Sequence, residues 1–449
     1  MKAEMQNPRK ILRGFGGTSG FLFLLSSFIL HPSSFLPVRQ RNHLLALTLL
    51  ALFVASGVWY FRAFVQPRKP FGIVVFVGEG LVTSRLTAAR LYDGGADHRL
   101  TIDGLPHVAL LGTSAADFAV PDSAAAASAL ACGAKVNHRA LCTDPQGRAL
   151  PPLLRTAAAH GRWTGLVTNG SLTDPTPAAF YANAADCRDR EALTDQLFAP
   201  PAPLQVVLGG GAADFLPATS GGRRKDGRDL AAQAAHDAGY VLLHTTGDLQ
   251  AVQPWLGQRL LGLFAPDAFP FRDQTPAGVA APPALSEAVA AAIASLQRHR
   301  GGYLLVVDAG LIERAALENQ GERALQELLE LDRAVAVALR YAGPQSLVVV
   351  AGGPAAGGLS LNGYPMRQDR GVSLVGGINA YGFPSLTWAT GPAGPVPGAP
   401  PPMAPAAYFS PYAANVADDA IAAGAGPGSE GLQGFKENTT VYDLIRAQL

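Results

Sequence analysis

The chain has 449 residues, of which 48% are hydrophobic and 15% charged, and 35 lysines and arginines against 34 aspartates and glutamates leave a formal net charge of +1. This apolar content excludes a disordered chain, and the lack of a basic excess argues against a nucleic-acid-binding protein. The three cysteines form no Cys-x-x-Cys pair, which excludes a disulfide-stapled scaffold and a zinc ribbon.

The N-terminal part of the chain holds two apolar runs. The run at 21–30 is too short to cross a bilayer. The run at 44–65 is long enough, and Arg62 is its one charged residue. We therefore predict one transmembrane helix over 44–65, preceded by a cytoplasmic or targeting segment over 1–43.

The flanks of this run indicate its orientation. Six lysines and arginines precede the span and three follow it closely, which favours an internal N-terminus and a body outside the cytoplasm, in the periplasm or cell envelope. Trp59 and Tyr60 stand where an interfacial aromatic belt would lie. The alternative is a signal sequence cleaved near the small residues at 55–57, which would release a secreted protein.

From residue 71 onward, short runs rich in Val and Leu alternate with helical patterns. Continuous apolar runs of this length are typical of strands buried on both faces. The alternation predicts an α/β fold of three layers, with helices on both faces of a central, mostly parallel sheet. The predicted strands are 73–77, 164–167, 205–208, 303–307 and 346–350. The predicted helices are 82–91, 123–134, 149–160, 229–238, 286–298 and 322–341.

The C-terminal part is rich in Pro and Gly. Residues 391–405 include seven prolines, and we predict an irregular loop over 391–433 before a closing helix near the C-terminus. No break in composition divides 71–390, so we predict one domain over 71–449.

Oxygen-bearing side chains follow several predicted strands. Because ligands bind at the carboxyl ends of strands in such sheets, we expect these side chains to converge. Two or three carboxylates with a hydroxyl suit a hard cation such as Mg²⁺. The residues are Glu79, Asp174, Thr176 and Asp308, with Glu313 five positions beyond the last of them.

Ser123 opens an alanine-rich predicted helix. The positive end of a helix stabilises an alkoxide or a bound phosphate. Each position also has a structural explanation: Asp122 and Ser123 are common helix-capping residues, and Glu79 could lie in a surface turn. Acidic residues are likewise common in the first turn of a helix, as at Glu313. Their joint occurrence at strand ends favours a site.

The order of these segments resembles the alkaline phosphatase family over nearly all of 71–449. The segment VPDSAAAASALACGAKVN resembles the nucleophile segment of that family, and VTNGSLTDPTPAAFYAN resembles its magnesium segment. The resemblance implies a phosphomonoesterase with two zinc ions and one magnesium ion. In that family a serine attacks phosphorus, and zinc-bound water hydrolyses the phosphoserine.

Residue by residue, the resemblance makes Ser123 the nucleophile. Asp174, Thr176 and Asp308 fall on magnesium ligands, with Asp308 in place of a glutamate. Glu79 falls on the aspartate that bridges magnesium and one zinc. One exchange lengthens a side chain by a methylene and the other shortens one, so a magnesium ion would persist only in a shifted position.

The zinc positions depart from the family pattern. The zinc-binding Asp-His pair of the family falls on Gly353 and Pro354. Two further zinc ligands of the family, an aspartate and the histidine four residues later, fall on Glu313 and Leu317. No histidine follows His299. One zinc site would retain two protein ligands and the other one, short of the three typical of catalytic zinc. We therefore predict that zinc is not bound in the two-zinc arrangement, and that two-zinc turnover is absent or very weak.

The phosphate-binding arginine of the family falls on Cys187, with Arg188 and Arg190 close by, and we predict Arg188 in its role. The prediction is an alkaline-phosphatase-like hydrolase scaffold with weak or altered activity on a phosphate ester. Mg²⁺ is its candidate cofactor, and Glu313 is a candidate extra ligand. The alternative is a catalytically inactive binding or structural protein at the cell envelope. The predicted partners are a membrane, through the N-terminal helix, and no nucleic acid; a homodimer is implied by the resemblance alone.

Overall fold

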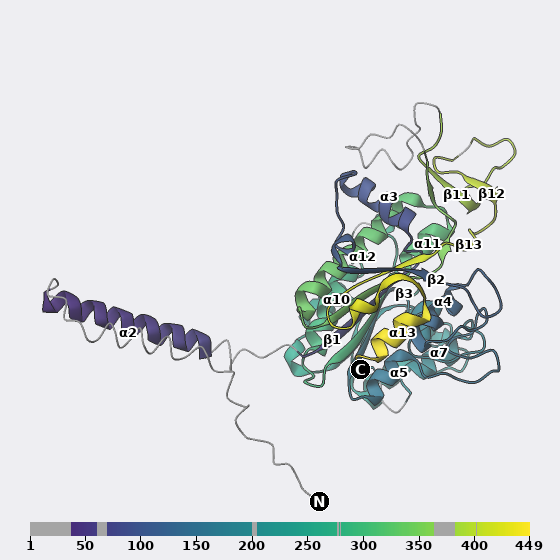
Figure 1. Ribbon diagram of the computed structural model, residues 1–449. Helices are drawn as coiled ribbons and strands as arrows, with labels where there is room; N and C mark the ends of the chain where they lie inside the picture. Colours follow the sequence, from purple (N-terminus) through teal and green to yellow (C-terminus); the bar gives the residue numbers. More distant parts are fainter. Residues whose placement is uncertain are drawn as a thin grey trace, which may run out of the picture. The chain divides into compact units, whose positions relative to one another are not determined.

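The structure, a computed structural model, describes residues 37–60, 70–199, 204–275, 278, 280–362, 382–400 and 402–449 (Figure 1). The chain divides into two compact units, Met1–Arg68 and Lys69–Leu449. Each unit is described by itself.

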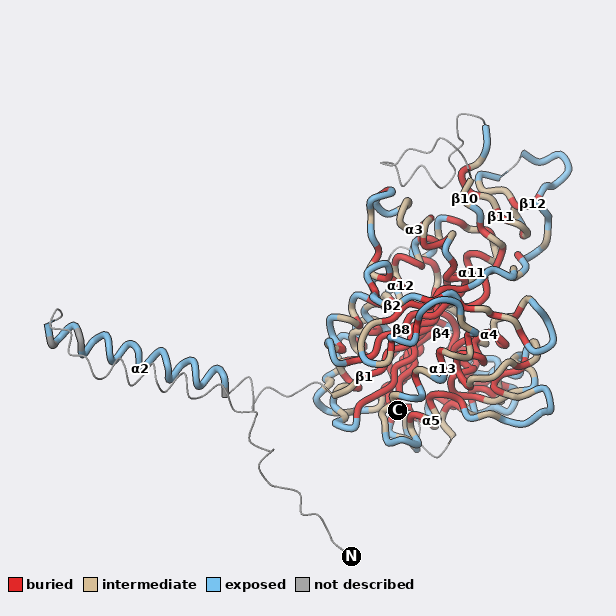
Figure 2. The backbone as a smooth tube through the Cα atoms, viewed as in Figure 1, coloured by how far each residue is buried: buried red, intermediate tan, exposed pale blue. Residues whose placement is uncertain are grey.

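The described part of the first unit is a single helix, α2 (Val38–Tyr60). Its stretch Asn42–Trp59 has a mean hydropathy of 1.7, so the helix is long and apolar enough to cross a membrane. A signal sequence near the N-terminus has the same properties. Figure 2 colours the residues of this helix as exposed. The apolar run at 21–30 and the last residues of the predicted span, 61–65, lie outside the described residues.

The second unit is built on a ten-stranded sheet. Its strands are β1 (Gly72–Gly78), β2 (His107–Gly112), β3 (Trp163–Ser171), β4 (Val206–Gly210), β5 (Tyr240–Leu243), β6 (Arg259–Leu263), β7 (Tyr303–Asp308), β8 (Leu347–Gly352), β14 (Ala420–Ala425) and β15 (Gln433–Glu437). Their order across the sheet is β15-β2-β14-β8-β1-β7-β3-β4-β6-β5. All neighbours are parallel except the two pairs that β14 makes.

Helices cover both faces of this sheet. One apolar core joins α3 (Thr83–Gly94), α10 (Leu285–Leu296) and α12 (Gly321–Ala342) to one face. The other core joins α4 (Ser123–Cys132), α5 (Leu153–Ala159), α6 (Pro175–Ala179), α7 (Arg190–Leu197), α8 (Leu230–Ala238) and α13 (Thr439–Arg446) to the opposite face.

Strand β1 shows why two cores form. Its side chains alternate between the faces, with Val74 and Phe76 in one core and Val75 and Val77 in the other. The strands at the centre of the sheet are buried throughout (Figure 2). The predicted three-layer α/β fold is confirmed.

Smaller elements complete the unit. The helices α9 (Thr246–Ala251) and α11 (Leu311–Leu317) follow β5 and β7. A small sheet pairs β10 (Ser360–Leu361), β11 (Leu386–Gly391) and β12 (Ala406–Phe409), and a second pairs β9 (Ala355–Ala356) with β13 (Asn415–Val416).

The five predicted strands and six predicted helices are all present, and the closing helix is α13. The prediction of an irregular loop over 391–433 is wrong for part of its length, because β12, β13 and β14 lie within it. Strand β14 reads AIAAGA, and Ala and Gly are depleted in strands, so the sequence carries no strand pattern there. Pairing with β8 and β2 stabilises this strand, although its residues have low strand propensity.

The centre of the sheet positions the site. Strands β1, β7 and β3 are neighbours, and in their register Asp308 pairs with Val77 on one side and with Thr168 on the other. The polar residues that follow these strands therefore meet at one edge of the sheet.

Candidate active site

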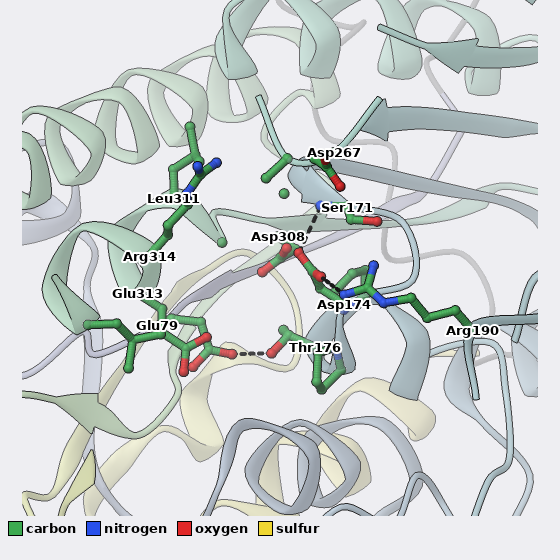
Figure 3. A pocket seen from close by; sticks show the side chains of 16 residues that line it. Glu79, Ser171, Asp174, Thr176, Arg190, Asp267, Asp308, Leu311, Glu313 and Arg314 are labelled. Carbon is green, nitrogen blue, oxygen red and sulfur yellow. Dashed lines mark hydrogen bonds and ion pairs between the residues drawn. The ribbon is translucent and has the colours of Figure 1, made fainter. Parts of the chain in front are cut away.

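A pocket of about 380 Å³ lies at this edge (Figure 3). It collects all five predicted metal-site residues from three separate segments of the chain. The five are Glu79, Asp174, Thr176, Asp308 and Glu313. The convergence expected from the carboxyl ends of the strands is therefore present.

The β3–β7 side of the pocket holds two carboxylates around a glycine. Asp308 ends β7, and its Oδ2 accepts a hydrogen bond from Thr168 Oγ1 at 2.6 Å. Asp174 precedes α6, and its Oδ2 accepts from the Ser171 backbone at 2.8 Å. A Cβ on Gly170 would lie 3.0 Å from Asp174 Oδ2 and 3.6 Å from Asp308 Oδ2. A side chain at residue 170 would therefore crowd both carboxylates, and glycine lets them approach the backbone closely.

The β1–β8 side is arranged differently. Glu79 follows β1 and is 1% exposed, and its Oε1 accepts a hydrogen bond from the Thr176 hydroxyl. The second carboxylate oxygen of Glu79, Oε2, is buried without a partner. A Cβ on Gly353 would clash with this oxygen. The Glu79 carboxylate therefore fills the space beside residue 353.

Ser123 lies at the start of α4, where the sequence predicts it. Asp122 caps this helix by accepting a hydrogen bond from the Ala125 backbone at 2.8 Å. The Ser123 hydroxyl donates a hydrogen bond to Glu313 Oε1. Glu313 belongs to α11, directly after β7, and lines the pocket. The hydroxyl and a carboxylate able to take its proton are thus already in contact.

Burial raises the pKa of every carboxyl in this group. It raises the pKa of Asp308 to about 8 and that of Glu313 to about 7, with nearby carboxylates adding to both increases. Burial also raises the pKa of Asp174, and it raises that of Glu79 well above the usual range, with the Glu313 charge as the next cause. Ionising all four together requires a compensating positive charge.

Arg190, rather than Arg188, lines this pocket. Its guanidinium lies 3.2 Å from Asp174 Oδ1 and 2.9 Å from Asp214 Oδ2 (Figure 3). The Arg188 side chain is 70% exposed and is paired with Asp186. Arg190 begins α7, only two residues beyond the predicted position, so sequence spacing alone does not separate the two arginines.

Arg85, which was not among the residues predicted from the sequence, is 1% exposed. Its guanidinium donates to the backbone carbonyls of Glu79 at 3.4 Å and Gly80 at 3.2 Å, and also to that of Ala356. Burial lowers its pKa to about 10, while the charges of Glu313 and Glu79 act to raise it. An arginine in a helix is ordinarily exposed, so no sequence pattern reveals that this cation lies beneath the pocket.

Comparison with known proteins assigns the fold and these segments to a family. A model of the alkaline phosphatase family matches residues 72–385. The chain belongs to the alkaline phosphatase family. This confirms the resemblance seen in the nucleophile and magnesium segments.

Characterised members of the alkaline phosphatase family align over most of the chain. The tissue-nonspecific isozyme of alkaline phosphatase from Gallus gallus is 31% identical over 372 residues, which cover 71% of this chain and 70% of that protein. Streptomycin-6-phosphate phosphatase from Streptomyces griseus is 32% identical over 360 residues, covering 69% and 79%. Both alignments extend across more than two thirds of each protein.

Solved structures of alkaline phosphatases share the fold. The enzyme from the Antarctic bacterium TAB5 gives a TM-score of 0.67 at 21% identity, covering 84% of this chain and 98% of that chain. The Thermus thermophilus enzyme gives a TM-score of 0.67 at 25% identity, covering 84% and 91%. The three-layer fold is therefore that of an alkaline phosphatase.

The family is metal-dependent, so the donors of this pocket were compared with those that metals require. The pocket is lined by no histidine or cysteine, and the described residues hold no group of three His, Cys, Asp or Glu side chains arranged for a metal. The carboxylates instead face hydroxyl groups or Arg190. Two buried oxygens lack partners, Asp308 Oδ1 and Glu79 Oε2. These donors are carboxylate and hydroxyl oxygens, the type that hard cations prefer, whereas the histidine and cysteine ligands typical of zinc do not line the pocket.

Proposed function

We propose that the protein is a phosphomonoesterase of altered metal dependence, in which Ser123 is the nucleophile and Glu313 accepts its proton. The hydrogen bond from the Ser123 hydroxyl to Glu313 at the start of α4 carries this proposal. A serine needs an adjacent base or a metal to act as a nucleophile, and Glu313 supplies the base. Its raised pKa, about 7, is suited to proton transfer near neutral pH.

The reaction follows from these contacts. Glu313 takes the proton as Ser123 Oγ forms a bond to phosphorus, and the ester bond to the alcohol breaks. Protonated Glu313 then gives the proton to the leaving alkoxide. A water then attacks the phosphorus of the phosphoserine and gives a proton to Glu313. The bond from Oγ to phosphorus breaks, and Glu313 returns the proton to Oγ. Arg190 and the positive end of α4 offset the charge on the phosphoryl oxygens.

Asp174, Thr176, Asp308 and Glu79 are the residues that would hold Mg²⁺ or Mn²⁺, with Glu313 as a further candidate ligand. Such an ion, when bound, supplies positive charge that stabilises the phosphoryl oxygens. Two unpartnered buried oxygens, Asp308 Oδ1 and Glu79 Oε2, support this assignment. A TAB5 alkaline phosphatase variant, with aspartate in place of a histidine, holds Mg in its M3 site (TM-score 0.66, 22% identity). Carboxylates in place of histidines are consistent with a hard ion.

The proposed location of the catalytic domain is outside the cytoplasm. Helix α2 supports a membrane anchor, or a signal sequence whose cleavage would secrete the domain. The substrate class is a phosphate ester, the class on which the family acts.

The test uses the full chain purified in detergent and a chromogenic phosphate ester, with Mg²⁺, Mn²⁺ or Zn²⁺ added separately. We expect release with Mg²⁺ or Mn²⁺ that Ser123→Ala lowers by at least about a thousandfold. Ser220→Ala, at an exposed serine outside the pocket, is the matched control. No release by a folded protein with any metal would support the alternative, an inactive binding or structural protein. Two zinc ions per chain by elemental analysis would contradict the proposed metal dependence.

A further inference from the structure

A second pocket, of about 340 Å³, adjoins the active-site pocket and shares Arg190 with it. We call it the basic pocket. Its lining has five cationic side chains against three carboxylates. The cations are Arg188, Arg190, Arg223, Arg224 and Lys225. Aspartates form ion pairs with all four arginines, so Lys225 is the cation of this lining to which the described residues give no ion pair.

Three arginines of the basic pocket, Arg190, Arg223 and Arg224, are held by ion pairs and hydrogen bonds. Asp214, 1% exposed, receives Arg190 at 2.9 Å and Arg223 at 3.1 Å through its two oxygens. Arg224 is fully buried, and its guanidinium donates to Thr194 Oγ1 at 2.6 Å. Guanidinium groups fixed in this way lose little conformational entropy when they bind an anion.

Donors remain available toward a ligand. Arg190 donates three hydrogen bonds, to Thr173, Asp214 and Asp174, and a guanidinium has five N–H groups. Within the described residues, the Lys225 ammonium forms no ion pair or hydrogen bond. Arginine and lysine donors of this kind bind phosphate strongly.

We propose that the basic pocket binds a second anionic group of the substrate, so that the preferred substrates are small molecules carrying two phosphate groups. This inference rests on the proposed function, in which the first phosphate lies in the active-site pocket next to Glu313, the hydrogen-bond partner of Ser123. Arg190 lies between the two groups and contacts both. Arg188, which sequence spacing suggested for the reacting phosphate, here binds the second one.

The test compares a hexose bisphosphate with the corresponding hexose monophosphate, using the full chain with Mg²⁺. We expect kcat/KM to be at least about tenfold higher for the bisphosphate. Lys225→Ala and Arg188→Ala should each raise KM for the bisphosphate about three- to tenfold and change the monophosphate less than about twofold. Both residues are exposed and lie outside the proposed machinery of the reaction.

Arg148→Ala is the matched control, because Arg148 is 77% exposed and lines neither pocket. Equal kcat/KM for the two substrates, unchanged in the Lys225 and Arg188 variants, overturns the inference and leaves the proposed function standing.

A binding measurement separates the remaining outcomes. Calorimetric titration of the Ser123→Ala protein with each compound needs no turnover. Tighter binding of the bisphosphate that Lys225→Ala weakens, together with no hydrolysis by the unmodified protein, supports the basic pocket as an anion site and overturns the proposed hydrolase. Equal binding of both compounds overturns the basic pocket whether or not hydrolysis is seen.

Discussion

The two sides of the active-site pocket differ in how they are stabilised. On the β3–β7 side, Asp174 and Asp308 lie close to Gly170, and Asp174 is paired with the partly exposed Arg190. On the β1–β8 side, Glu79 reaches into the space beside Gly353, and its backbone carbonyl accepts a hydrogen bond from the buried Arg85. Each side keeps one unpartnered carboxylate oxygen, Asp308 Oδ1 on the first and Glu79 Oε2 on the second. The two sides differ in the cation that faces them, which is partly exposed on the first and buried on the second.

Volume and charge both distinguish the side at Glu79. The Glu79 side chain occupies the space beside Gly353, and the buried charge of Arg85 opposes those of Glu79 and Glu313. The β1–β8 side is thus packed around a buried cation, whereas the β3–β7 side brings Asp174 and Asp308 together at the pocket.

The largest expected effect is at Glu313. Glu313→Gln removes the base while keeping the size of the side chain and a hydrogen-bond partner for Ser123. We expect kcat on a phosphate ester to fall about 10²- to 10⁴-fold with little change in KM, since proton transfer contributes that much to such reactions. Steady-state kinetics with Mg²⁺ measure the effect.

Glu437→Gln, at an exposed position of β15, serves as the control for Glu313→Gln. A Glu313→Gln enzyme with unchanged kcat would show that Ser123 is activated without this carboxylate. The base would then have to be sought elsewhere in the pocket.

The second-largest expected effect is a loss of stability when the buried guanidinium of Arg85 is removed. Arg85→Met leaves the carbonyls of Gly80 and Ala356 without their donor and removes a charge that favours ionised Glu79. We expect a loss of about 2–4 kcal/mol in the free energy of unfolding, because one partner of a buried polar group is removed while the other remains. Urea denaturation followed by circular dichroism measures it.

Arg90→Met on the same helix is the control, since Arg90 forms a partly exposed ion pair with Asp103 and should cost at most about 1 kcal/mol. Adding Glu79→Gln to Arg85→Met should recover about 1 kcal/mol or more if the two charges compensate each other. If the two arginine variants lost equal free energy of unfolding, the buried guanidinium of Arg85 would not set the β1–β8 side apart from the β3–β7 side.

Sequence patterns predict the layers and the residues that meet at the sheet edge, for definite reasons. Strands buried on both faces appear in the sequence as continuous runs of Val and Leu. Parallel strands end at the same edge of the sheet, so Glu79, Asp174 and Asp308 meet there regardless of loop conformation. The apolar period of a helix shows equally well in α12.

What the sequence does not predict depends on tertiary contacts. Strand β14 forms because β2 and β8 pair with it, although its alanines carry no strand signal. Burial of Arg85 depends on carbonyls up to 271 positions away in the chain. The choice of Arg190 over Arg188 depends on Asp174 and Asp214, which come together only in the folded sheet.

A smaller effect tests the exchange between positions 79 and 353. Gly353→Asp alone should cost about 1–3 kcal/mol, because the new side chain meets the Glu79 carboxylate. The double variant Glu79→Asp/Gly353→Asp should recover about 1–2 kcal/mol, since the shorter side chain at 79 vacates the space. Gly104→Asp is the control, as a side chain at Gly104 meets no atom within 4 Å. If the two substitutions cost strictly additive free energies of unfolding, the side chains at 79 and 353 do not compete for the same space.

The smallest effect per step is a pH dependence of stability in protein freed of metal by chelation. Burial raises the pKa of Asp308 to about 8 and that of Glu313 to about 7, so the folded state holds protons that the unfolded state has released by pH 6. Stability is therefore greatest at low pH with respect to these groups and falls as pH rises through the folded pKa values, by about 1 kcal/mol per retained proton between pH 6 and 7.

Denaturation midpoints at pH 6 and 7 measure this fall, and Asp308→Asn should flatten it because the amide does not titrate. Added Mg²⁺ should stabilise the protein more at pH 8 than at pH 6, since a cation replaces the protons on these carboxylates. If the metal-free protein became more stable from pH 6 to pH 7, the buried carboxyls would not hold protons in the folded state. The negative charges of Asp174 and Asp308 would then already be balanced by a nearby cation, as that of Glu79 is by Arg85.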